Sequence, residues 1–377
     1  MNPLAKFLRF MGIYGLRRTV YKSAGRSRRL ARWLGPSPSP TRDIGTIGCG
    51  QFAFATVGCI VSKQLGNRFA DCFDPDLRAR DSFANFYRIA CPSSHAMELI
   101  ERTDIELIYI ISNHASHSDY ALAALAAGKR VYIEKPVAVT EQQAIDLFQA
   151  IRKDPSRAFA GYNRPHSAAI RWIRERSADL EGPLTLTCTV LGHVLGPDHW
   201  YRIPAEGTRI CGNVGHWIDL AIHVFAWDSM PAWVDVTIAY SNPATRDDDV
   251  AIMITTPRRD LVTIVITSRG EPFEGINETI VYQRADLIAK IDDFRTMHWW
   301  IGESRGRKRY YPKDVGHVRA IMQPFAGGAR DWSEVEISTM LMLRITEMVR
   351  GGVTSRRFAI RSGDDLADVS SSVREVG

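Results

Sequence analysis

Apolar residues between Asp43 and about Gly161 occur in short runs, and segments with helical spacing separate these runs. The runs Ile44–Ile47 and Leu107–Ile111 have the length of buried strands, whereas residues 116–128 and 141–152 place apolar side chains at the spacing of a helix. Strands that alternate with helices are typical of a parallel sheet with crossover helices. The pattern therefore predicts an α/β domain of the Rossmann type.

The pattern changes after a predicted helix at residues 170–176, because apolar and β-branched residues then alternate with polar ones. This alternation occurs in the segments LTLTCTVLG, WVDVTIAY, VAIMIT, LVTIVITS, NETIVYQ, LIAKIDDF and TMHWWI. It predicts an α+β domain with an open, largely antiparallel sheet that packs helices on one face. We expect the other face to form a pocket or a homo-oligomer interface. Trp299 and Trp300 suit such an interface, and half-buried sheet residues are the alternative.

The length of 377 residues and the 45% hydrophobic content allow two domains. We predict that the α/β domain of the Rossmann type spans residues 43–163 and that the α+β domain, with its pocket or homo-oligomer interface, spans residues 164–362. A basic arm and a Pro/Ser linker, residues 1–42, precede them. Residues 363–377 are expected to be a weakly ordered tail.

The positive charge belongs to the arm, because residues 1–42 contain ten Lys or Arg and no acidic residue. Subtracting these ten charges from the net charge of +6 leaves −4 for the rest of the chain, so we expect no nucleic-acid partner. The arm places apolar residues at helical spacing, with basic residues roughly opposite: Leu4, Phe7, Leu8, Met11 and Tyr14 against Lys6, Arg9 and Arg17. Residues 1–34 therefore predict peripheral contact with an anionic membrane, and a solvated or domain-packing extension is the alternative. The segment Gly35–Pro40 reads as a stiff, poorly ordered linker.

The spacing of the cysteines indicates a reducing compartment. The six cysteines are scattered without CxxC spacing, so we predict neither a metal site nor a disulfide framework. No apolar run approaches the roughly 20 residues of a membrane span. We expect a cytoplasmic protein, with the inner face of the membrane as the site of any peripheral contact.

The stretch IGTIGCGQFA, Ile44 to Ala53, predicts a dinucleotide-binding turn. Gly48 permits the tight turn after the strand, Gly50 lets the backbone approach a pyrophosphate, and Ala53 is small enough for helix–strand packing. Amides at the start of the following helix would bind the phosphates.

A second strand, RFADCFD, ends on Asp74 at the distance that the dinucleotide motif requires. A carboxylate there fits the ribose hydroxyls and would repel the extra phosphate of NADP, so NAD is favoured. Arg78 softens that preference. The alternative is a solvated turn aspartate, because the run from Asp74 to Asp76 is good turn chemistry.

Four motifs in this order resemble the Gfo/Idh/MocA family of glucose–fructose oxidoreductase and inositol dehydrogenase: GCGQFA, SNHASHSDYALAALAAGK, VYIEKP and GYNRP. The resemblance covers roughly residues 43–350. It implies an NAD-dependent oxidoreductase that transfers a hydride to or from a secondary alcohol or ketone of a sugar or nucleotide sugar. Surface-polysaccharide biosynthesis is a setting that would suit a membrane-seeking arm.

The resemblance also implies the residues of the site. Lys135 of EKP matches the lysine that reaches the substrate hydroxyl beside the nicotinamide. The expected cofactor-binding residues are Gly48, Gly50, Gln51, Phe52, Ala53, Asp74, Asn113, His117, Glu134 and Lys135. The expected substrate-binding residues are Asn163, Arg164 and Asp219 from the resemblance, and Tyr201, Arg209 and Asn213 from their own polar or aromatic chemistry. A loop that is only solvated is the alternative for Tyr201 and Arg209. For His117 a role in the nicotinamide pocket and a helix-capping role both stay open.

A second catalytic element is expected in DHWYRIPAEGTRICGNVGHWIDLAIHVF. The family form is an aspartate, a histidine four residues later and another aspartate three residues after that. His216 and Asp219 match the last two, but Gly212 stands where the first aspartate is expected. A neutral imidazole suits proton abstraction near physiological pH, so His216 is the expected base. The alternatives are a buried structural histidine and, given Gly212, a catalytically altered NAD-binding protein that acts as a binding, assembly or regulatory partner.

Overall fold

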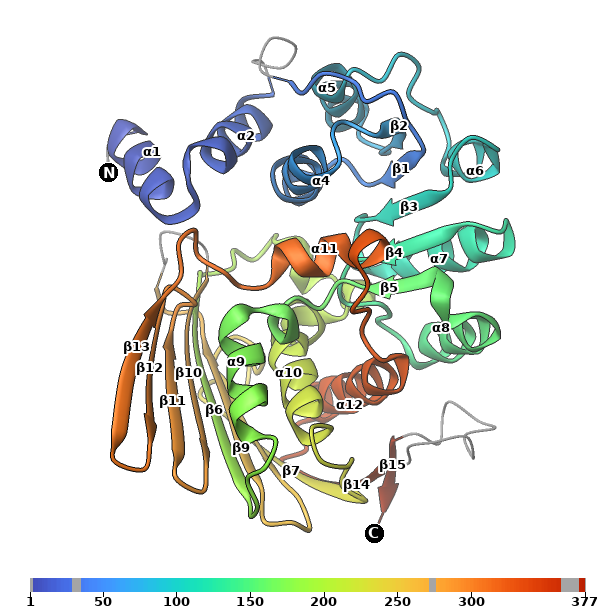
Figure 1. The fold of residues 1–377 in the computed structure, drawn as a ribbon. Helices are drawn as coiled ribbons and strands as arrows, with labels where there is room; N and C mark the ends of the chain where they lie inside the picture. The colour runs from blue at the N-terminus through green and yellow to red at the C-terminus, as the bar shows by residue number, and fades with distance from the viewer. Residues whose placement is uncertain (1–2, 29–34, 271–275, 361–372, 377) are drawn as a thin grey trace. The chain divides into compact units, whose positions relative to one another are not determined.

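The computed structural model describes residues 3–28, 35–270, 276–360 and 373–376 (Figure 1). The chain divides into two compact units, which we describe separately. The first comprises residues 1–137, 146–161 and 317–330, and the second comprises residues 138–145, 162–316 and 331–377. None of the helices in the described part of the chain combines the length and apolar character that a membrane span needs.

The first unit is built on a parallel sheet with strand order β2-β1-β3-β4-β5. The strands are β1 (Ile44–Ile47), β2 (Phe69–Phe73), β3 (Leu107–Ile110), β4 (Arg130–Ile133) and β5 (Ala158–Ala160). β1 and β3 are buried along their whole length, which explains their uninterrupted apolar sequences. The predicted Rossmann sheet is confirmed.

Helices connect these strands as the crossover pattern requires (Figure 1). They are α4 (Gly58–Gln64), α5 (Leu77–Tyr87), α6 (Ala96–Glu101), α7 (His117–Ala126) and α8 (Glu141–Lys153). No sequence pattern predicts that α11 (His317–Ala326) also belongs to this unit. The carbonyl of Ile321 in α11 accepts a hydrogen bond from the Tyr109 hydroxyl at 2.7 Å, and Gln323 donates to the Ala160 carbonyl at 2.9 Å.

The basic arm is folded into two helices, α1 (Pro3–Tyr14) and α2 (Leu16–Ser27), that meet at Gly15, whose φ is 81°. Tyr21 and Ala24 of α2 are part of the core of the first unit. Phe10 and Ile13 of α1 are buried as well, although they lie outside the apolar set that the sequence analysis names. The burial of these residues agrees with the alternative of a domain-packing extension for this part of the arm.

The predicted linker also has defined contacts. Pro38 forms a parallel bridge with Asn67, and the Ser39 amide donates to the Asn67 carbonyl at 3.0 Å. The Asn67 side chain donates in turn to the carbonyl of Pro36. The expectation of a poorly ordered linker was therefore wrong for Gly35–Pro40, because backbone pairing fixes its central residues.

The second unit contains a sheet of ten strands in the order β13-β12-β11-β10-β6-β9-β8-β7-β14-β15. β6 and β9 are parallel, and the other described pairs are antiparallel. Their bounds are β6 (Leu184–Gly192), β7 (Trp233–Tyr240), β8 (Val250–Thr255), β9 (Leu261–Thr267), β10 (Ile276–Arg284), β11 (Leu287–Asp292), β12 (Thr296–Ile301), β13 (Ser304–Arg309), β14 (Ser355–Ile360) and β15 (Val373–Val376). The predicted open, largely antiparallel sheet is confirmed.

Two edges of this sheet differ from expectation. β13 has the polar sequence SRGRKR, so no hydrophobic alternation marks it as a strand. β15 lies in the predicted tail, and its residues 373–376 pair with β14. The expectation of a weakly ordered tail was wrong for these four residues, and residues 361–372 and 377 lie outside the described part of the chain.

Three helices, α9 (Ala168–Ser177), α10 (Gly215–Phe225) and α12 (Trp332–Gly351), lie over one face of the large sheet (Figure 1). A buried ion pair links this layer to the sheet. Arg164, at the start of the unit, donates from Nε and Nη2 to both carboxylate oxygens of Glu278 in β10, at 2.9 and 3.0 Å. Trp217 of α10 donates to the same carboxylate at 2.9 Å, and its ring lies under the Arg164 guanidinium.

Replacing Glu278 with Ala should lower the free energy of unfolding by about 3–5 kcal/mol, because it leaves a buried guanidinium without its carboxylate. Chemical denaturation measures this change. Arg269→Ala is the control, since that side chain is 69% exposed and its pair with Asp249 should contribute no more than about 1 kcal/mol. A similar small loss in both variants would contradict the role of the buried pair.

Candidate functional site

The glycine loop leaves β1 with a geometry that only glycine permits at its first position. Gly48 has φ 95°, and a Cβ there would lie 2.3 Å from the carbonyl oxygen of Ile111. At Gly50 a Cβ would meet nothing within 4 Å, so the space above this backbone is open. Ala53 is buried in the helix that follows. Open space at the second glycine, next to the start of a helix, fits the approach of a pyrophosphate.

Asp74 is held against this loop after β2. Its Oδ2 accepts a hydrogen bond from the Cys49 amide at 2.7 Å, and its Oδ1 accepts from the Asp76 amide at 2.9 Å. The structure thus places the carboxylate beside the loop that would hold a dinucleotide. The bond to the Asp76 amide is the turn contact that the sequence analysis gave as the alternative. Asp74 therefore makes this turn contact and also lies beside the glycine loop.

The other two predicted loop residues contact neighbouring parts of the first unit. Gln51 donates through Nε2 to the Lys22 carbonyl of α2, at 3.2 Å. The ring of Phe52 lies 5.5 Å from the ring of His317 in α11. Gln51 and Phe52 are the first residues of the helix that follows the loop. At this place their backbone amides, rather than their side chains, are suited to bind a phosphate.

A π-helical segment occurs in each unit next to the residues that the sequence singled out. Ala53–Val57 follows the glycine loop, and Ile210–Val214 precedes His216. Such segments widen the helix and are frequent at functional sites. The second one contains Gly212 and Asn213, so the position that lacks the expected aspartate lies in irregular backbone.

The EKP motif begins directly after β4. The carboxylate of Glu134 accepts a hydrogen bond from the Tyr132 hydroxyl at 3.2 Å, and a Cβ at Gly161 would collide with it. Burial, together with the Glu134 charge, raises the pKa of Tyr132, so the phenol stays protonated and acts as the donor. Lys135 is half-buried at the strand end. Because β1, β3 and β4 are parallel neighbours, Lys135 and the glycine loop lie at the same edge of the sheet.

His117 and Asn113 lie on the segment between β3 and α7. Both ring nitrogens of His117 face main-chain carbonyls, with Nδ1 2.8 Å from the Pro136 oxygen and Nε2 3.1 Å from the Ser112 oxygen. Asn113 accepts a hydrogen bond from Ser116 Oγ at 2.7 Å. His117 is buried and connects the end of the EKP segment to the β3 loop, which suits a positioning role.

His216 lies in the first turn of α10, in the second unit. It is half-buried, and its ring lies 6.4 Å from the ring of Tyr162. Asp219, one turn later, is fully buried and accepts a hydrogen bond from Ser338 of α12 at 3.1 Å. The match to the family's aspartate thus lies on the face of α10 that packs against α12.

Three more of the predicted substrate-binding residues, Asn163, Arg164 and Tyr201, have internal partners in this unit. Asn163 donates to the Val315 carbonyl at 2.6 Å, and Arg164 binds Glu278 as described above. The Tyr201 hydroxyl lies 3.5 Å from the Gly212 carbonyl, and Asn213 is buried. These contacts indicate that Asn163 and Arg164 help to build the framework around α10.

Arg209 is a buried cation in the loop before α10. It is 1% exposed, its amide donates to Asp247 Oδ2 at 3.1 Å and its Nη2 donates to the His193 carbonyl at 3.3 Å. Nη1 lies 3.8 Å from Asp248 Oδ1. Burial lowers the pKa of this guanidinium, and the two carboxylates oppose that effect.

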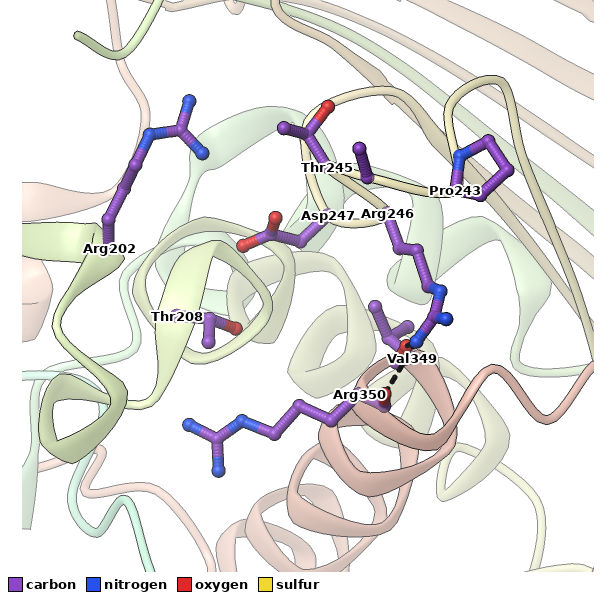
Figure 2. Close-up of a pocket in the computed structure, with 9 residues that line it drawn as sticks. Arg202, Thr208, Pro243, Thr245, Arg246, Asp247, Val349 and Arg350 are labelled. Carbon is purple, nitrogen blue, oxygen red and sulfur yellow. Dashed lines mark hydrogen bonds between the residues drawn. The ribbon is translucent and has the colours of Figure 1, made fainter. Parts of the chain in front are cut away.

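A cavity of about 210 Å³ lies beside this loop (Figure 2). Its lining residues are Arg202, Thr208, Pro243, Ala244, Thr245, Arg246, Asp247, Val349 and Arg350. Arg202 is paired with Asp248, and Arg246 donates to the carbonyls of Val349 and Arg350 at the end of α12. The arginine side chains are thus used in part to hold the loops of the cavity wall.

One residue at the dinucleotide loop was missed by the sequence reasoning. Arg28, at the end of α2, donates to the Cys49 carbonyl at 3.1 Å. Neither spacing nor composition could reveal this contact, because the arm lies outside the family motifs and its approach to the loop is a result of tertiary packing.

Replacing Gly50 with Ala should leave the free energy of unfolding within about 1 kcal/mol of the natural value, because the new methyl group enters open space. The same methyl should lower the affinity for NAD at least about tenfold, since it occupies the space that a pyrophosphate would enter. Calorimetric titration and chemical denaturation test the two effects. Gly48→Ala is the comparison and should fail to fold stably, and unchanged NAD affinity in Gly50→Ala would contradict the assignment.

Comparison with known proteins agrees with this geometry. The Gfo/Idh/MocA model, described as an oxidoreductase family with an NAD-binding Rossmann fold, matches residues 42–162. An inositol 2-dehydrogenase of Ralstonia nicotianae is 28% identical over 207 residues, which are 53% of this chain and 58% of that protein. The alignment therefore spans little more than half the length of this curated relative.

Two solved structures are similar in fold. UDP-N-acetylglucosamine 3-dehydrogenase GnnA from Acidithiobacillus ferrooxidans superposes with a TM-score of 0.65 at 16% identity, over 84% of this chain and 98% of its own. GenD2 from gentamicin A biosynthesis, in complex with NAD, superposes with a TM-score of 0.68 at 15% identity, over 87% of this chain and 99% of its own. The open glycine loop, the parallel sheet and the matched motifs together identify residues 42–162 as an NAD-binding Rossmann domain of the Gfo/Idh/MocA oxidoreductase family.

Proposed function

We propose that the chain is an NAD-dependent oxidoreductase that interconverts a secondary alcohol and a ketone on a sugar or nucleotide sugar. One observation carries the proposal: the glycine loop after β1 and Lys135 after β4 lie at the same edge of one parallel sheet. A dinucleotide held at the loop would extend along this edge, where binding residues of such sheets gather. Lys135 then stands at the end where a substrate oxygen would react.

The residues of the chain would divide the work as follows. Gly48, Gly50 and the amides of the following helix would hold the pyrophosphate, and Asp74 would face the ribose. When bound, the nicotinamide would supply hydride chemistry. Lys135 would donate a hydrogen bond to the substrate oxygen and stabilise negative charge that develops there. His216 would accept the proton of the alcohol, or return it in the reverse direction.

Substrate class rests on the relatives and on the chemistry of the second unit. The relatives described above act on inositol and on a UDP-linked amino sugar. Trp200 is 40% exposed and, with Tyr201, would offer an aromatic face to a sugar ring. Arg209 is 1% exposed and would meet the phosphates of a nucleotide sugar only if the loop that carries it moved. A precursor of a surface polysaccharide fits this description.

The second candidate is an NAD-binding protein without turnover that acts as a binding or assembly partner. The observation that favours it is Gly212 in place of the expected aspartate, in irregular π-helical backbone. In that case His216 would have no reacting proton to accept. The two candidates share the cofactor site and differ in turnover.

Replacing Lys135 with Ala should lower kcat by about 10²–10⁴, because a positioned donor that stabilises developing charge contributes on this scale. The measurement follows absorbance at the reduced-nicotinamide band while sugars and nucleotide sugars are supplied with NAD. Lys153→Ala, an exposed lysine at the end of α8, is the matched control.

Loss of turnover in Lys135→Ala with full turnover in Lys153→Ala would support hydride transfer at this site. Equal turnover in both variants would remove Lys135 from the chemistry. NAD binding without an absorbance change for any substrate would favour the second candidate.

We also propose that the arm makes peripheral contact with an anionic membrane surface. Leu4, Leu8 and Leu16 remain exposed although α2 of the arm is part of the core of the first unit, and the arm carries no acidic residue. Exposed leucines beside Lys and Arg suit the interface of an anionic bilayer.

We also propose that a homo-oligomer forms through the face of the large sheet opposite α9, α10 and α12. Leu191 and Met253 are exposed on that sheet.

Replacing Leu8 with Glu should reduce co-sedimentation with vesicles that contain anionic lipid by at least about threefold, because it removes apolar contact and adds repulsion. Met97→Glu is the control: Leu8 and Met97 are 50% and 48% exposed, but Met97 lies in α6, outside the arm. Equal sedimentation of the natural chain and Leu8→Glu would remove the membrane proposal.

A further inference from the structure

The guanidinium of Arg28 links the arm to the dinucleotide loop. Nη2 donates to the Cys49 carbonyl at 3.1 Å, and Nη1 donates to Ser82 Oγ of α5 at 2.9 Å. Each terminal nitrogen of a guanidinium carries two hydrogens, so these bonds leave a further N–H on each. Arg28 is half-buried, and burial is the main reason why its pKa is lowered.

Arg28 lies in the electrostatic surroundings of the predicted ribose site. Asp74, Asp76 and Arg78 are among the charged groups that act on it. Arg78 is exposed at the start of α5, directly after the Asp74–Asp76 turn. Two guanidiniums from distant parts of the chain therefore accompany the carboxylate that was expected to exclude NADP.

The Asp74 carboxylate is fixed in position beside the loop. Both of its oxygens already accept hydrogen bonds from backbone amides, those of Cys49 and Asp76. Each oxygen keeps a further acceptor position, so the carboxylate can still face a ribose hydroxyl. The repulsion between this carboxylate and the 2′-phosphate of NADP would therefore have to be offset by the neighbouring cations, Arg28 and Arg78.

We propose that Arg28 makes the arm part of the cofactor site and that, with Arg78, it binds the 2′-phosphate of NADP, so that the chain accepts NADP alongside NAD. Arginine suits this task because its planar fork binds two phosphate oxygens at once. The bond to the Cys49 carbonyl sets the guanidinium beside the loop before the cofactor arrives. The inference rests on the proposed dinucleotide site and concerns its cofactor preference.

Two contacts show why the arm can hold Arg28 in this place. Tyr21 of α2 packs edge-on against Phe86 of α5 with ring centroids 5.1 Å apart, and Gln51 of the loop helix donates to the Lys22 carbonyl. α2 is thus attached both to α5 and to the helix that follows the glycine loop. Its last residues are positioned by the same elements that position Asp74.

Binding of NAD and NADP to the full chain, measured by calorimetry without substrate, tests the proposal. Arg28→Ala should weaken NADP binding about tenfold or more and change NAD binding less than about threefold, because only NADP carries the phosphate. Arg28→Lys should restore part of the NADP affinity, since a point charge replaces the fork. Arg26→Ala, an exposed arginine of α2, is the matched control and should leave both affinities unchanged.

Thermal unfolding of the cofactor-free variants separates binding from arm packing. If Arg28→Ala unfolds at the natural temperature and loses NADP selectively, the proposal stands. Equal losses for both cofactors, or no loss for either, would overturn it and leave the dinucleotide site of the proposed function in place. A natural chain that binds neither cofactor would overturn the inference and the proposed function together.

Discussion

The close approach of the Gly48 backbone to the carbonyl of Ile111 is the constraint on which the first unit depends. A side chain at this position would collide with the Ile111 carbonyl, so the turn out of β1 can pass close to the end of β3 only as glycine. In the loop that follows, the Cys49 amide donates a hydrogen bond to the Asp74 carboxylate. The space next to the Gly50 backbone is open. The site for a dinucleotide is therefore a consequence of strand packing, and the side chains around it add preference rather than shape.

The sequence predicted the parts of the fold that have a local signal. Uninterrupted apolar runs identified β1 and β3, and alternation identified β6 to β12, because one-faced and two-faced burial impose different patterns. The same reasoning could not find α11 in the first unit, because its attachment depends on hydrogen bonds to Tyr109 and Ala160 that are remote in sequence. β13 has no apolar alternation, so only its pairing with β12 reveals it.

Sequence motifs predicted the glycine loop and Lys135 of the candidate site, but not the partners of its other side chains. Glycine spacing and the EKP motif located the loop and Lys135, since both depend on backbone geometry at strand ends. Side-chain partners were beyond the sequence: Arg164 is bound to Glu278 and Asp219 to Ser338, and neither partner lies near its motif. The arm shows the same limit, because its amphipathic pattern does not reveal that Phe10 and Ile13 are buried while Leu4 and Leu8 are exposed.

The central claim is that this chain holds a nicotinamide dinucleotide at the open glycine loop with its reacting end at Lys135. A crystal structure of the full chain grown with NAD tests this most directly. We predict that the pyrophosphate will lie against the backbone of Gly50, that the adenosine ribose will lie beside Asp74, and that the nicotinamide ring will lie next to the Lys135 side chain. A dinucleotide bound elsewhere, or a nicotinamide ring remote from Lys135, would contradict the account.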